Sequence, residues 1–327
     1  MQQGMRWRRF TNRLALALFA LIASAAAAQT YPSKPVRMIL PFPPGGPTDL
    51  LGRLIAERLS EKLGQPVVTE NRPGAGGNVG AEAAARATPD GYTIVLCAPS
   101  LAISPSLYSK LNYDPVRDLA AVSLVATIPN VLVVHPSVNA KTLDELVQFA
   151  RANPGKLNFG SGGAGTSNHL AGELLKTMSG ANLVHVPYKG VETAMKAMLG
   201  GETQLVVIGV PAAARYISGG QLRGLAILGK ERVATVADVP TAKEAGWPGF
   251  EVETWYGILT AAQAPREAIV RLNRDLREAL QSPELRERLS KIGIEPRGTS
   301  AEDFGVFLKT ETTRWAKVVK DAGAKVD

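Results

Sequence analysis

The sequence holds few of the residues on which catalytic and metal sites depend. Its 327 residues include one cysteine, Cys97, and three histidines, His135, His169 and His185. A single cysteine excludes an intrachain disulfide and a cysteine-based metal site, and no His-Glu-x-x-His motif places two histidines on one helix face. A Gly-x-Ser-x-Gly nucleophile elbow is also missing. The sequence therefore predicts no catalytic residue, no metal site and no cofactor.

Aromatic residues are scarce at 6%, and the charged fraction is 20%. The formal net charge is +8, but Arg6, Arg8, Arg9 and Arg13 lie in the first 28 residues, which hold no acidic residue. Without that segment the net charge is +4. The remainder lacks the clustered basic and aromatic residues typical of nucleic-acid binding. The composition indicates a soluble protein with a slight preference for anions and no nucleic-acid partner.

The apolar stretch at the N-terminus is too short for a transmembrane helix. Leu14–Ala28 falls below the roughly 20 residues that span a bilayer, follows a basic segment and ends in a run of alanines. This is the pattern of a signal peptide over residues 1–28, cleaved before Gln29, with a membrane anchor as the alternative. The Arg8-Arg9 pair leaves Sec and twin-arginine export open. No cysteine follows the apolar stretch, so we predict an unanchored periplasmic protein.

A glycine-rich loop, residues 41–49, lies between an apolar run, Val36–Leu40, and a helical pattern that begins near Leu50. The run predicts a buried strand. Thr48 or Asp49 is expected to cap the helix, because a short side-chain oxygen accepts a bond from a first-turn N–H. Gly45 and Gly46 allow close approach of a ligand to the backbone. Strand, glycine turn and helix N-terminus together predict an anion site.

The pattern of a strand, a loop and a helix repeats along the chain. A second strand, 66–70, precedes a second glycine loop, 71–80, and a helix, and a third strand, 92–97, precedes an irregular segment, 98–113, that carries Ser100. Short loops between alternating strands and helices predict a doubly wound, mostly parallel sheet. Ligands of such sheets bind beyond the carboxyl ends of the strands.

A second α/β unit follows two apolar strands, 122–126 and 131–135, which we interpret as the first crossing between lobes. Thr142 begins a capping box with Glu145. A strand at 157–159, a loop at 160–167 and a helix repeat the earlier unit, and a strand at 250–260 is expected to cross back. We therefore predict two Rossmann-like lobes joined by two crossing strands, with the ligand cleft between them. Lobe 1 comprises residues 29–127 and 260–327, and lobe 2 comprises residues 128–259.

Gly160-x-Gly162-x-x-Gly165 has the form of a dinucleotide fingerprint, which makes an exported enzyme with a nucleotide or acyl substrate the alternative function. That fingerprint needs an acid about 20 residues further on, and the strand there, 183–188, has none. His169, in the first turn of the following helix, is expected on the helix surface or against a bound anion. Tyr188 is expected at the rim of the glycine loops, as a ligand contact or in ordinary packing.

Several longer motifs resemble one family. They are Tyr-Pro-Ser-Lys-Pro-Val-Arg (31–37), Pro-Phe-Pro-Pro-Gly-Gly-x-x-Asp (41–49), Glu-Asn-Arg-Pro-Gly-Ala-Gly-Gly-Asn (70–78), Pro-Asp-Gly-Tyr-Thr (89–93), His-Leu-Ala-Gly-Glu (169–173), Val-Pro-Tyr-Lys-Gly (186–190) and Asp-Val-Pro-Thr-x-x-Glu-Ala-Gly (238–246). These motifs follow one another in this order along the whole mature chain. They resemble the motifs of the periplasmic receptors of tripartite tricarboxylate transporters, the Bug proteins.

The resemblance implies a type II periplasmic binding protein that holds a small carboxylate between its lobes, partly through water, for the membrane subunits of a transporter. A ligand-presenting sensor is a further alternative, and a monomer is expected. The expected ligand contacts are Phe42, Pro44, Gly45, Gly46, Thr48, Asp49, Asn78, Ser100, Ser161, Gly162, Gly165, Thr166, Ser167, Tyr188 and Ile208.

The chain departs from the family pattern at two positions. Pro47 stands where a small residue is usual, so the first loop offers one fewer N–H. Ile208 stands where the family often has an acid. An ammonium group would lack a partner there, and a buried unpaired charge is costly. We therefore expect a carboxylate whose remainder is uncharged or apolar, unless Asp49 points into the cleft.

Overall fold

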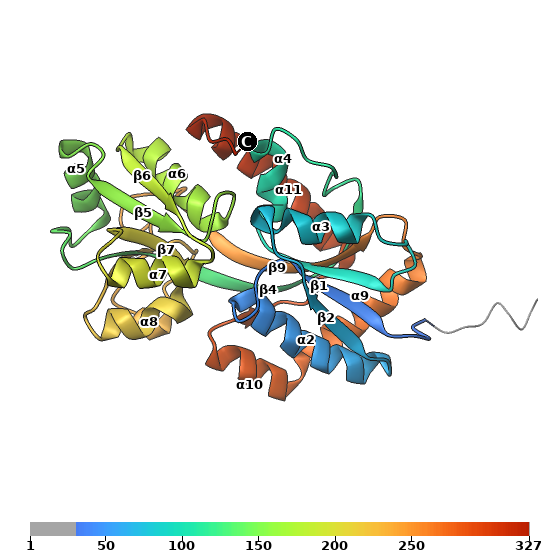
Figure 1. Cartoon of the computed structure of the whole chain (residues 1–327). Coiled ribbons are helices and arrows are strands. Elements are labelled where there is room, and N and C mark those ends of the chain that lie inside the picture. The colour runs from blue at the N-terminus through green and yellow to red at the C-terminus, as the bar shows by residue number, and fades with distance from the viewer. Residues whose placement is uncertain (1–30, 327) are drawn as a thin grey trace, which may run out of the picture.

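The computed structural model describes residues 31–326, so the predicted signal peptide lies outside the described residues. Two lobes lie side by side and are joined by long strands (Figure 1). The strands are β1 (Val36–Leu40), β2 (Val67–Asn71), β3 (Thr93–Cys97), β4 (Leu119–Val134), β5 (Leu157–Ser161), β6 (Leu183–Pro187), β7 (Leu205–Gly209), β8 (Arg223–Ile227), β9 (Glu253–Ala261) and β10 (Glu295–Pro296). The helices are α2 (Pro47–Leu63), α3 (Asn78–Ala85), α4 (Ser100–Leu107), α5 (Leu143–Ala152), α6 (Ser167–Ser179), α7 (Val191–Leu199), α8 (Val210–Ser218), α9 (Arg266–Gln281), α10 (Pro283–Lys291) and α11 (Ala301–Ala322), with short 3₁₀ turns at η1 (Ala75–Gly77) and η2 (Ala234–Val236).

One sheet runs through both lobes in the order β2-β1-β3-β9-β4-β7-β5-β6, with β8 and β10 also paired to β4. In lobe 1, β1 pairs in parallel with β2 and β3, and β9 is inserted antiparallel between β3 and β4. In lobe 2, β5 pairs in parallel with β6 and β7. The predicted fold class, two α/β lobes joined by two crossing strands, is confirmed. The prediction of a mostly parallel sheet is wrong, because the crossing strands β4 and β9 pair antiparallel with their neighbours and make the sheet mixed in each lobe.

The two strands predicted at 122–126 and 131–135 are a single strand, β4. Its residues 119–129 pair with β9, and its residues 130–134 pair with β7 and β8. Asn130 marks the change, where its side-chain amide donates to the carbonyl of Val252 at 2.8 Å. The break expected between residues 126 and 131 is absent, because Asn130 is buried within the extended chain with its side-chain amide hydrogen-bonded.

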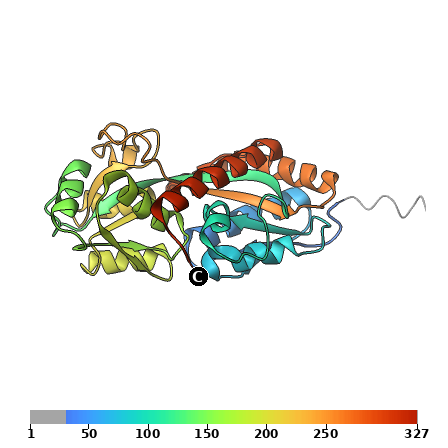
Figure 2. The same ribbon diagram turned by 90° about the horizontal axis from the view of Figure 1, so that it is seen from above.

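The hydrophobic core is shared on one face of the sheet and divided on the other. Residues of α3, α4, α5, α6 and α11 form one continuous cluster across both lobes. On the opposite face, α2, α9 and α10 pack on lobe 1, and α7 and α8 pack separately on lobe 2. Helix α11 packs against α4 and α6, and Figure 2 shows it running across the junction. The lobes therefore share a packed core on one face of the sheet and have separate cores on the other.

Short polar side chains cap several helices, including the one predicted to begin at Thr142. Thr142, Ser282 and Ser300 cap α5, α10 and α11, each accepting a bond from an N–H in the first turn. The irregular segment predicted at 98–113 is wrong in part, because it contains α4. That helix carries Pro105 and has poor local propensity, but burial of Leu101, Ile103 and Leu107 in the shared core overrides it.

Among residues 31–326, no helix combines the length and the apolar character that crossing a membrane requires. The same residues contain no cluster of three or more histidine, cysteine or acidic side chains suited to a metal ion.

Candidate ligand-binding site

A cleft of about 1490 Å³ opens between the lobes on the face where the core is divided. Within residues 31–326, five helices begin at its wall: α2 and α4 from lobe 1, and α6, α7 and α8 from lobe 2. The first N–H groups of a helix have no partner inside the helix, and they carry its positive partial charge. Convergence of these helix starts is an arrangement that suits an anion.

The first loop enters α2 differently from the prediction. Gly46 is the N-cap residue, Pro47 occupies the first turn, and no side chain caps the helix. The prediction that Thr48 or Asp49 is the cap is therefore wrong. Pro47 lacks an N–H and has a φ suited to the first helical position, so the helix begins one turn earlier than the apolar pattern indicated.

Asp49 orders the loop from behind instead. Its carboxylate accepts from the N–H of Gly45 at 3.0 Å, from Arg53 Nε at 3.0 Å and from Asn71 Nδ2 at 2.9 Å. Burial raises the pKa of Asp49, but these hydrogen bonds and the Arg53 charge outweigh burial and lower the pKa to about 2. Asp49 is 6% exposed and does not line the cleft. It holds Gly45 in a conformation with φ of 86°, which leaves the loop presented to the cleft.

The second loop enters α6 through Thr166, which is the N-cap residue. Its hydroxyl accepts from the N–H of His169 at 3.4 Å and donates to the carbonyl of Gly163 at 2.7 Å. Thr166, Ser167 and Asn168 line the cleft. The Asn168 amide donates to the carbonyl of Val207 at 2.7 Å and so ties α6 to β7. Three consecutive residues of this helix start therefore face the ligand space on a braced backbone.

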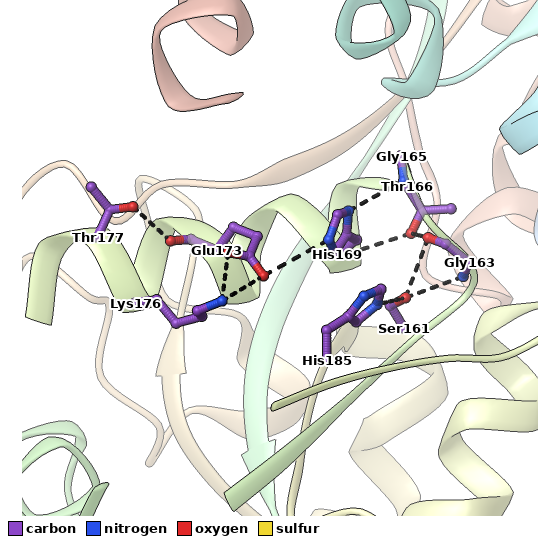
Figure 3. Close-up of polar contacts among 9 residues, drawn as sticks. All are labelled: Ser161, Gly163, Gly165, Thr166, His169, Glu173, Lys176, Thr177 and His185. Atoms are coloured by element: carbon purple, nitrogen blue, oxygen red, sulfur yellow. Dashed lines mark hydrogen bonds and ion pairs between the residues drawn. The ribbon is translucent and has the colours of Figure 1, made fainter. Parts of the chain in front are cut away.

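Two histidines support this loop from inside lobe 2 (Figure 3). The imidazoles of His169 and His185 stack with centroids 4.0 Å apart, and Phe159 stacks on His185 at 4.8 Å. His169 Nδ1 accepts from the N–H of Gly165 at 3.2 Å, and His185 Nε2 lies 2.6 Å from the Ser161 hydroxyl. The expected position of His169 on the helix surface is wrong, because it is 6% exposed, and its side chain does not line the cleft.

These histidines are neutral. Burial lowers the pKa of His169 to about 3, with the neighbouring His185 and Lys176 adding to the effect. Burial and Lys176 lower the pKa of His185 to about 4. A neutral His169 that accepts at Nδ1 carries its proton on Nε2, which lies 3.8 Å from the carboxylate of Glu173. The pair therefore fixes the loop through hydrogen bonds and packing and brings no positive charge to the cleft.

The structure brings ten of the fifteen expected contacts to the cleft wall: Phe42, Pro44, Gly45, Gly46, Thr48, Ser100, Gly162, Thr166, Ser167 and Ile208. It places five others outside that wall: Asp49, Asn78, Ser161, Gly165 and Tyr188.

Those five residues support the loops or pack elsewhere. Asn78 Oδ1 accepts from the Tyr113 hydroxyl at 2.9 Å. The Ser161 hydroxyl accepts from the N–H of Gly163 at 3.2 Å. Gly165 packs so close to Leu107 that an added Cβ would lie 2.9 Å from its side chain. The Tyr188 hydroxyl donates to Glu202 at 3.4 Å, away from the ligand space.

Sequence reasoning missed many polar or aromatic residues of the cleft wall, among them Asn168, Lys189, Glu192 and Tyr256. The position of Glu192 on the cleft wall depends on how α7 packs, which no local sequence pattern indicates. Ile208 lines the cleft beside Ile128 and Val210, so part of the wall is apolar as expected. The expected lack of an acid does not hold, because Glu192 lies on the wall.

Two α/β lobes that share crossing strands, with a cleft where helix N-termini converge, define the type II periplasmic binding protein class. Comparison with known proteins identifies the family of the chain within this class. A family model described as the tripartite tricarboxylate transporter family receptor matches residues 51–324. BugT of Bordetella pertussis is 39% identical over 307 residues, which cover 93% of this chain and 94% of the relative.

Solved structures agree with this assignment. MatC from Rhodopseudomonas palustris, solved with bound malate, has a TM-score of 0.79 at 30% identity and covers 88% of this chain and 100% of its own. A protein of R. palustris solved with adipate has a TM-score of 0.83 at 36% identity, with 90% of this chain and 100% of that chain covered. The chain belongs to the tripartite tricarboxylate transporter receptor family, as the sequence motifs predict.

Proposed function

We propose that this chain captures a small carboxylate in the periplasm and delivers it to the membrane subunits of a tripartite tricarboxylate-type transporter. The ligand class is a dicarboxylate, a tricarboxylate or an aromatic acid. The matching family of transporter receptors supports the role, and relatives solved with adipate and malate support the ligand class. The protein acts as a monomer, without a cofactor and without catalysis.

One observation carries the proposal: the starts of α2, α4, α6, α7 and α8 converge on one cleft. N–H groups at these starts suit a carboxylate, and a charge-assisted hydrogen bond contributes roughly 1.5–3 kcal/mol. Because both lobes supply such groups, a bound carboxylate bridges them. Its affinity is highest when the lobes approach, so binding favours closure.

We propose that residues 29–127 with 260–327 move as one lobe and residues 128–259 as the other. The shared core around α11 holds one face of the junction together, and the divided core on the cleft face leaves that side free to close. This arrangement is typical of hinge closure around a ligand.

The alternative, an exported enzyme with a nucleotide or acyl substrate, rests on the glycine pattern at 160–165. Of its three glycines, Gly162 alone lines the cleft. A Cβ on Gly160 would lie 3.2 Å from Val206, and one on Gly165 would lie 2.9 Å from Leu107, so both serve close packing inside the protein. The pattern therefore has a packing role that requires no pyrophosphate.

Thermal unfolding in the presence of two ligand panels tests the proposal. One panel holds dicarboxylates, tricarboxylates and aromatic acids, and the other holds NAD, ATP and acyl-coenzyme A. A ligand at about 100 times its dissociation constant adds about 2.7 kcal/mol of stability. We expect stabilisation by a carboxylate, and stabilisation by nucleotides alone would transfer the assignment to the enzyme.

A further inference from the structure

Glu192 reaches across the cleft from lobe 2 toward lobe 1. It lies in the first turn of α7 and lines the cleft. Its Oε1 lies 4.0 Å from the position that a Cβ on Gly46 would take, and its Oε2 lies 3.3 Å from the corresponding position on Gly190. Gly46 and Gly190 are the N-cap residues of α2 and α7. The carboxylate therefore lies between two helix starts, one from each lobe.

Among residues 31–326, Glu192 is the one acid on the cleft wall without an ionic partner. Two other acids line the cleft, and both are paired: Glu287 with Lys291 at 2.7 Å and Glu295 with Arg297 at 2.9 Å. No hydrogen bond or ion pair within the described chain involves the Glu192 side chain. It therefore has oxygen lone pairs free to accept from a ligand.

An unpaired carboxylate in this position acts differently on different ligands. It repels a second anionic group placed beside it. Glu192 is exposed in the open cleft, where water screens this repulsion, and the repulsion strengthens when closure of the lobes excludes water. The carboxylate attracts an ammonium and accepts from a hydroxyl. The apolar residues Ile208 and Val210 also line the cleft, but they are almost fully buried and offer a ligand neither a hydrogen-bond partner nor a charge. Glu192 therefore distinguishes ligands by the group that lies next to their bound carboxylate.

We propose that Glu192 is the specificity-determining residue of the cleft. The preferred ligand has one carboxylate held by the helix starts and an O–H or N–H donor that reaches Glu192. This inference rests on the proposed function and narrows its ligand class. It also replaces the sequence-based expectation of an uncharged remainder, because that expectation assumed a cleft without an acid.

Calorimetric titration of matched ligands tests the assignment. Each set shares one skeleton and differs in one substituent: succinate, malate and aspartate; glutarate, 2-hydroxyglutarate and glutamate; phenylacetate, mandelate and phenylglycine. We expect the wild-type protein to bind the hydroxyl or ammonium member at least about tenfold more tightly than the unsubstituted member. The hydroxyl and ammonium members show which donor Glu192 prefers.

The variant Glu192→Gln keeps the shape and removes the charge, and Glu231→Gln is the matched control, because Glu231 is an exposed acid of lobe 2 that does not line the cleft. In Glu192→Gln the tenfold preference should fall toward equality, with the unsubstituted member of each set gaining affinity. Glu231→Gln should keep the wild-type ratios. Thermal unfolding of both variants checks that the fold is intact.

Three outcomes would overturn the assignment. Unchanged ratios in Glu192→Gln would show that Glu192 does not contact the ligand. An equal gain for every member of a set would show that Glu192 only competes with the ligand for the helix starts. Binding of no carboxylate by the wild-type protein would overturn the proposed function together with this inference, whereas the first two outcomes leave the proposed function standing.

Discussion

Gly162 offers the sharpest test of the second loop, because its space is closed by backbone. A Cβ at this position would lie 2.9 Å from the nitrogen of Val191, 3.3 Å from the carbonyl carbon of Gly190 and 3.4 Å from Val191 Cα. The N–H of Gly190 also donates to the carbonyl of Gly162 at 3.2 Å. No flexible side chain is available to move aside. Gly162→Ala must therefore push the loop and the start of α7 apart.

The expected cost has two parts. Forcing a methyl group into a closed space destabilises the fold by about 1–3 kcal/mol. Because the displaced segments are the starts of α6 and α7, the N–H groups of the two helices no longer converge on one carboxylate. Loss of one charge-assisted hydrogen bond, at roughly 1.5–3 kcal/mol, weakens binding about 10- to 100-fold. Gly162→Val adds more bulk and should weaken binding further.

Calorimetric titration with the tightest carboxylate of the thermal panel, together with urea unfolding, measures both parts. Gly305→Ala is the matched control, since Gly305 lies inside α11 and an added Cβ would meet Ala121 at an ordinary 3.9 Å. Removing a helical glycine should stabilise the protein by up to about 1 kcal/mol and leave affinity unchanged. Wild-type affinity in a folded Gly162→Ala variant would refute the role of this loop in binding.

Four further predictions follow from the site, the fold and the leader. Ser167→Ala should weaken carboxylate binding about tenfold without loss of stability. Thr166→Ala should weaken binding and also lower stability by about 1 kcal/mol, because Thr166 caps α6. Wild-type affinity of both variants in calorimetric titration would show that the binding site lies elsewhere. Saturating ligand should reduce the radius of gyration in small-angle scattering, and an unchanged radius would indicate a rigid cleft. The pKa values of His169 and His185 are lowered to about 3 and about 4, so below about pH 6.5 the unfolded chain binds more protons than the folded chain. The contribution of the two neutral histidines to stability is therefore fully present above that pH, and the free energy of unfolding falls by on the order of 1 kcal/mol per pH unit per histidine toward pH 4. Equal free energies of unfolding at pH 7 and pH 5 would contradict this. Intact mass of the periplasmic form should begin at Gln29, and a membrane-bound form that keeps residues 1–28 would count against cleavage.

Local sequence chemistry determined most of the elements. The apolar run Val36–Leu40 predicted a buried strand, because a short run of apolar residues is the main signal of such a strand. Thr142 with Glu145 predicted a helix start, because a capping box depends on two residues three apart. The glycine loops predicted helix N-termini facing a ligand, and long motifs predicted the family. Each of these signals lies within about ten residues of chain, so a sequence alone can carry it.

Only the tertiary structure decided which side of each element faces the cleft. Asp49 could cap, bind ligand or brace the loop, and the choice depends on Arg53 and Asn71, which reach it through packing of α2 and β2. His169 lies on a helix that reads as amphipathic, but stacking on His185 from β6 buries it. Glu192 became a cleft residue because α7 packs with its start facing Gly46 across the lobes. Long-range packing sets these orientations, and no local pattern encodes the direction in which a side chain meets a partner far along the chain.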